Sequence, residues 1–184
     1  MTGSVRLEAS VVIEESRLRL DYQIINDSDR AIYAFVLATD GARKTYPHQA
    51  YTCLSEDRKT LQLLLGATPE PTGISLNFLA LPLAVCIQSR ARYESYLDLQ
   101  IPVQEWHAYD PSDYPDGAEE VAVGHLDFEV TYIDENNTFF VDRAGEEGHV
   151  QVDGHPVEKL LFSYRLDQSV NVLVRPAEFN RFSL

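Results

Sequence analysis

Residues 5–25 read VRLEASVVIEESRLRLDYQII, and apolar side chains take alternate positions in two runs of this stretch. The first run covers residues 5–13, a Glu15-Ser16 pair interrupts it, and the second run covers residues 18–24. Successive side chains of a β-strand point to opposite faces, so the stretch predicts two half-buried strands joined by a tight turn.

Similar strand-like segments recur along the rest of the chain, separated by residues that favour turns. They lie at residues 31–38, 50–54, 60–65, 74–87 with a bend at Pro82, 93–103, 126–132, 160–166 and 170–174.

Three of these segments carry more specific expectations. Residues 31–38 are apolar on both faces, which is typical of a central strand. Residues 55–65 fit either a helix capped by Ser55 or a strand, and we favour the strand. The alternation near residue 130 predicts an inward face of Leu126, Phe128, Val130 and Tyr132 and an outward face of His125, Asp127, Glu129 and Thr131. A turn is expected at residues 167–169.

Short strands with regular turn signals predict a single all-β domain over residues 1–184, an antiparallel β-sandwich of about eight to ten strands. The architecture is most similar to the immunoglobulin-like sandwich, although the Trp and Cys spacing of antibody domains is absent. We expect a long acidic loop around 104–120 and a second irregular region around 134–157.

The net charge of −14 is concentrated in one stretch of the chain. Residues 105–153 hold fourteen acids and one base, Arg143, so they carry −13, whereas the rest of the chain is nearly neutral. Such a stretch can be a solvated face, a docking surface for a basic partner or a cation site. Nucleic acids and anionic membranes are disfavoured because they would be repelled.

Aromatic residues lie beside the acids in the first loop, and Trp and Tyr often anchor protein interfaces. The sequence therefore predicts a surface that binds a protein partner, possible self-association included, with no cofactor and no catalytic residue. Trp106 could instead close the end of the core or stack on a sugar ring in a carbohydrate-binding module. The candidate contact residues are Trp106, Tyr109, Asp110, Asp113, Tyr114, Asp116, Glu119 and Glu120.

Two metal sites are alternatives. Clustered carboxylates at 110–120 suit calcium, although their spacing is not that of an EF-hand loop. His125 and Asp127, with His149 or His155, resemble the His-x-Asp…His iron site of 2-oxoglutarate dioxygenases, and Arg165 stands where those enzymes bind the cosubstrate. Only 57 residues follow Asp127, too few for the rest of that core.

Other classes of function lack a sequence signal. The chain has no nucleophile elbow, no metalloprotease motif, no phosphate-binding glycine loop and no paired Cys-x-x-Cys, so we predict a protein that is not an enzyme. The N-terminus does not read as a signal peptide and no apolar run is long enough to span a membrane, which predicts a cytoplasmic protein. Cys53 and Cys86 are then expected to be buried thiols, with a disulfide between them as the alternative in an oxidising compartment.

Overall fold

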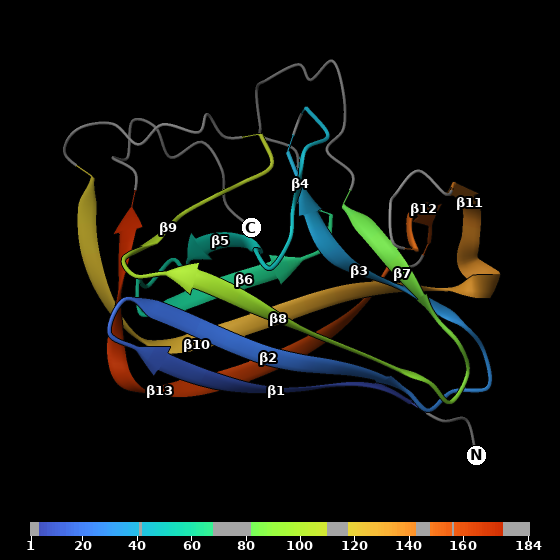
Figure 1. Ribbon diagram of the computed structural model, residues 1–184, viewed down its shortest axis with the longest axis horizontal. Helices are drawn as coiled ribbons and strands as arrows, with labels where there is room; N and C mark the ends of the chain where they lie inside the picture. The colour runs from blue at the N-terminus through green and yellow to red at the C-terminus, as the bar shows by residue number, and fades with distance from the viewer. Residues whose placement is uncertain are drawn as a thin grey trace.

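The computed structural model describes residues 4–40, 42–67, 82–109, 118–142, 148–155 and 157–174, which form almost entirely β-structure (Figure 1). A short 3-10 helix, η1 (Glu135–Asn137), separates two of the strands. In these ranges no helix has the length and apolar character needed to cross a membrane. The strands are β1 (Val5–Glu14), β2 (Arg17–Asn26), β3 (Ile32–Thr39), β4 (Thr45–Tyr46), β5 (Tyr51–Leu54), β6 (Thr60–Leu65), β7 (Leu83–Ile87), β8 (Arg92–Gln100), β9 (Val103–Gln104), β10 (Glu119–Asp134), β11 (Thr138–Asp142), β12 (His149–Gly154) and β13 (Glu158–Val174).

The strands form two sheets. The smaller sheet has the order β1-β2-β8 and is antiparallel throughout. The larger sheet is organised by β10, which pairs with β13 along most of its length, with β6 in its middle and with β3 at its end. From β3 this sheet continues through β7 and β12 to β11. β10–β6 and β13–β9 are parallel pairs, so the larger sheet is mixed rather than purely antiparallel.

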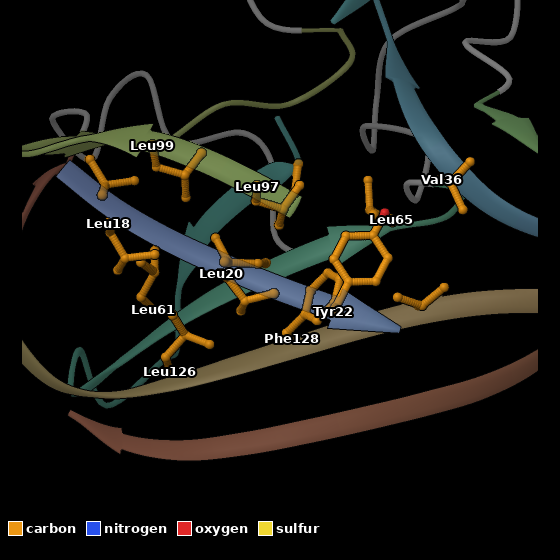
Figure 2. Close-up of a cluster of buried hydrophobic side chains, with 14 of the residues drawn as sticks. Leu18, Leu20, Tyr22, Val36, Leu61, Leu65, Leu97, Leu99, Leu126 and Phe128 are labelled. Atoms are coloured by element: carbon orange, nitrogen blue, oxygen red, sulfur yellow. The ribbon is translucent and has the colours of Figure 1, made fainter. Parts of the chain in front are cut away.

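The main core lies between the two sheets, and Figure 2 shows its central side chains. Leu18 and Leu20 of β2 point toward Leu61 and Leu126 of the larger sheet, and all four are fully buried. The rings of Tyr22 and Phe128 meet edge to face, with 5.1 Å between their centroids. The predicted inward faces of residues 18–24 and of Leu126, Phe128 and Val130 are therefore confirmed.

β3 is buried on both faces, as its sequence predicts. Ala34 and Val36 belong to the main core. Phe35, on the other face, packs in a second cluster with Ala84, Ile133, Val150 and Val152. Ala38 contributes to a third cluster, with Tyr51, Leu64 and Ala108.

The all-β sandwich predicted from the sequence is confirmed, and an immunoglobulin-like arrangement stays a prediction. The described residues contain thirteen strands, two of which have only two residues. Residues 60–65 form a strand, as favoured over a helix. Only the second half of the expected segment 74–87 can be compared with the structure, where it forms β7, because residues 68–81 lie outside the described ranges.

Two local predictions near the C-terminus are wrong. No turn interrupts β13 at residues 167–169. Instead, residues 166–169 form an irregularity within the strand, because Arg165 pairs with His125 and Val170 pairs with Val123, so that Gly124 alone stands opposite them. Thr131 is buried rather than outward, because its side chain lies against Gly66 and its hydroxyl donates to the carbonyl of Leu65 at the end of β6 (3.5 Å).

Both regions expected to be irregular contain strand residues. β9 includes Gln104, and β10 begins at Glu119, so strands occupy both ends of the 104–120 region. Within 134–157 the structure places η1, β11 and β12. The second region is thus a pair of strands at the end of the larger sheet.

Candidate functional site

Trp106 belongs to a half-buried aromatic cluster. Its backbone forms an antiparallel bridge with Thr52, through N–H···O contacts of 2.8 and 2.9 Å. Its ring lies 4.8 Å from that of Tyr46 and 5.0 Å from that of Tyr51, between centroids. Tyr109 packs against the same third cluster. The half-buried indole thus covers the outer face of β5 and β6, the core-closing role that the sequence left open.

Polar groups fix this segment against the sheet. The buried carboxylate of Glu105 accepts a hydrogen bond from the backbone N–H of Leu54 (3.0 Å). The Thr52 hydroxyl donates to the carbonyl of Gln104 (2.6 Å). His107 of the same segment is buried, and burial lowers its pKa from 6.5 to about 4. The imidazole is therefore neutral at physiological pH, which suits a structural role.

The other predicted contact residues fall into two groups, those at the start of β10 and those outside the described residues. Glu119 and Glu120 begin β10, where Glu119 pairs with Arg58 (2.6 Å) and Glu120 accepts a hydrogen bond from Asn171 (2.9 Å). Asp110, Asp113, Tyr114 and Asp116 lie outside the described residues. Of the eight candidates, the structure brings together Trp106 and Tyr109 around the third cluster.

Two further acids of residues 105–153 lie close to basic side chains from outside this stretch. Lys159 contacts Glu129 at 2.9 Å, and Arg30 approaches Asp134 at 4.0 Å. The net charge that the sequence concentrates in residues 105–153 is thus partly neutralised along β10.

The histidines and acids proposed for a metal site are not assembled. His125 and Asp127 lie on β10, whereas His149 lies on β12 beside β7. The ring of His155 packs against Phe139. Among the described residues no group of three His, Cys, Asp or Glu side chains could hold a metal ion. The calcium alternative falls mainly on residues 110–117, outside those ranges.

Both cysteines are thiols, but their environments differ from the expectation that both are buried. Cys53 is half-buried, and its thiol donates to the side-chain carbonyl of Gln62 (3.2 Å). Cys86 is exposed on β7.

Among the described residues of the acidic stretch, the most exposed apolar side chains lie on β11, which reads TFFVD. Phe139 is 73% exposed, Phe140 54% and Val141 42%. Among the described strands, β11 pairs with β12 alone, and it ends the strand order of the larger sheet, at the right-hand end of the molecule in Figure 1. We call β11 and β12 together the terminal strand pair. Three consecutive apolar side chains are therefore exposed to solvent on β11.

The terminal strand pair is held in place from its inner side. Val150 and Val152 of β12 are buried against Phe35 and Ile133. Gly154, opposite Thr138, lies so close to Asn137 that a Cβ atom would collide with its carbonyl oxygen. That carbonyl also accepts a hydrogen bond from the backbone N–H of His155 (3.0 Å). One strand of the pair is therefore anchored in a core while the other is presented to solvent.

Negative charge surrounds the exposed strand. Residues 134–155 contain six acids and one Arg, a net charge of −5. Glu135, Asp142 and Asp153 are exposed, and none of them takes part in an ion pair with another described residue. Asp153 stands directly opposite Phe140, so a carboxylate and an aromatic ring share one face.

Phe139, Phe140 and Val141 are not among the contact residues predicted from the sequence. Their signal is three consecutive apolar residues, without alternation, inside the most acidic part of the chain. No known protein-family model, no curated protein and no solved structure matches this chain.

Proposed function

We propose that this chain is a non-enzymatic module that binds a protein partner through the outer strand of the terminal strand pair. The observation that carries the proposal is the exposure of Phe139, Phe140 and Val141 on an edge strand. Burying such side chains against a partner removes apolar surface from water, the main favourable term in association.

The proposed contact region still lies in the acidic stretch, but its centre is β11 rather than the 104–120 region. The Trp106 ring already packs on Tyr46 and Tyr51, and Glu119 already pairs with Arg58. The acids Glu135, Asp142 and Asp153 instead surround exposed rings. Charge of this sign would steer a basic protein toward the rings and would repel nucleic acid.

The test is photocrosslinking in cells that contain the protein. A photoreactive phenylalanine analogue replaces Phe140, and the matched control carries it at Leu161, which is 61% exposed on β13. We expect a crosslinked protein at position 140 and not at position 161, and its purified form should bind the wild-type chain. Equal crosslinking at both positions would contradict the proposal.

A variant series completes the test with that purified partner. The double change Phe139→Ser and Phe140→Ser should weaken binding by about thirtyfold or more, as the loss of an interface anchor does. Leu161→Ser, which also removes an exposed apolar side chain, should leave the affinity unchanged. We also propose a cytoplasmic location, which fractionation of the same cells tests.

A further inference from the structure

β11 is an edge strand with little protection against further pairing. One edge pairs with β12, and no strand of the described residues pairs with the other. An open edge offers backbone N–H and C=O groups to another strand unless proline, lysine, a bulge or a covering loop blocks it. β11 contains no proline and no lysine, and a register shift falls at Phe139, leaving Phe140, Val141 and Asp142 in regular pairing.

The register of the terminal strand pair assigns side chains to faces. Directly opposed residues of two antiparallel strands share a face, and neighbours along one strand alternate. Phe140, Asp142 and Asp153 therefore share the outer face. Val141, opposite the buried Val152, lies on the inner face. A strand added to β11 would meet an aromatic ring, then an aliphatic side chain, then a carboxylate.

Charge selects among the strands that could occupy this edge. A second copy of this chain would bring the net charge of −5 of its residues 134–155 close to an equal charge, and this repulsion disfavours self-pairing. A segment with Lys or Arg opposite Asp142 would instead gain a complementary pair and faster association at low salt.

We propose that β11 binds an extended segment of a partner protein as an added strand, with two successive apolar residues beside one Lys or Arg. The apolar residues lie beside Phe140 and Val141, and the basic residue lies beside Asp142. This inference rests on the proposed function and specifies how the partner is recognised. Main-chain hydrogen bonds would supply affinity, and the alternating side chains would supply specificity.

The experiment begins with a phage-displayed library of random linear peptides, selected on the wild-type protein. Enriched peptides should carry the apolar, apolar, basic pattern in either chain direction. A synthetic consensus peptide should bind by fluorescence polarisation, and the Phe139→Ser, Phe140→Ser double variant should weaken it by about tenfold or more. The Leu161→Ser variant is the matched control and should bind as the wild type does.

N-methylated peptides separate strand addition from side-chain contact. Methyl groups on alternate amides block one edge of the peptide at a time, so one pattern should abolish binding and the other should preserve it. Equal binding of both patterns would overturn strand addition while leaving a protein-binding function intact. No enrichment, peptides that bind the double variant equally, or a wild-type dimer that the double variant abolishes would also overturn the inference.

Discussion

The hydroxyl group of Tyr51 donates a hydrogen bond to the carbonyl oxygen of Thr39 (2.7 Å) and accepts one from the backbone N–H of the same residue (2.9 Å). Both residues are buried, so a single side chain joins the end of β3 to β5 beneath Trp106.

Tyr51→Phe should therefore lower the free energy of unfolding by about 1–3 kcal/mol, because it removes one partner from two buried backbone groups. Urea denaturation followed by Trp106 fluorescence measures the loss. Tyr164→Phe is the control, since its hydroxyl lies 3.3 Å from Asp167 at an exposed position. A loss of equal size in both variants would show that the Thr39 bonds do not matter.

Acid should destabilise the protein through His107. Its pKa falls from 6.5 to about 4 on folding because of burial, so between these pH values the unfolded chain binds the proton that the folded chain excludes. Stability should be full above pH 6.5, decline as the pH falls toward 4, and lose up to about 3 kcal/mol from this group. Urea titrations across this range measure the decline, and His107→Gln should flatten it. An unchanged slope in the variant would assign the decline to other groups.

Gly154→Ala should lower the free energy of unfolding by about 1–3 kcal/mol, because the new methyl group meets the carbonyl oxygen of Asn137, which belongs to the backbone. Gly124→Ala provides the matched control, as nothing lies within 4 Å of its Cβ position. Thermal unfolding compares the two variants. Equal melting temperatures would mean that the terminal strand pair shifts freely to accept the methyl group.

The exposed phenylalanines should contribute little to folding. Phe140→Ser should change the free energy of unfolding by less than about 0.5 kcal/mol, as exposed positions usually do. Phe128→Ala, in the fully buried main core, should cost about 3–5 kcal/mol. Urea denaturation gives both values. A large loss from Phe140→Ser would identify β11 as part of the folding core rather than a contact surface.

Charge reversal should slow binding of the basic partner. Asp142→Lys with Asp153→Lys should reduce the association rate at low salt by about tenfold, and the difference should shrink as salt is added. Stopped-flow mixing measures the rate. Glu119→Lys is the control, because that carboxylate is already paired with Arg58. An equal reduction by Glu119→Lys would show that association depends on the net charge of the whole molecule and not on the acids of the terminal strand pair.

The parts of the fold that were predictable depend on local patterns. The strands at 5–13 and 18–24 follow from alternation alone, because one face of each packs on the core. The continuous course of β13 was not predictable, since its residues 166–169 are accommodated as an irregularity opposite Gly124 of β10, a strand remote in sequence. The parallel pairing of β6 with β10 likewise joins segments separated by three other strands.

The candidate site was predicted in outline only. Composition located the acidic stretch, but it could not show that Arg58 and Lys159 neutralise some of its acids. Nor could it show that Trp106 turns inward while Phe139 remains exposed, since both are large apolar side chains. Whether such a side chain is exposed depends on which strand lies at the edge of the sheet. The local sequence of β11 does not determine the order of the strands.

The central position of β10 also governs the order in which the protein can assemble. β3 and β6 leave the ribosome well before β10, yet each completes its pairing only with β10. β13, the longest partner of β10, is synthesised later still. Most contacts are therefore non-local, and closing such loops before any contact forms makes folding slow. During synthesis the edges that β3 and β6 offer to β10 stay unpaired until β10 emerges, and open edges of this kind favour aggregation.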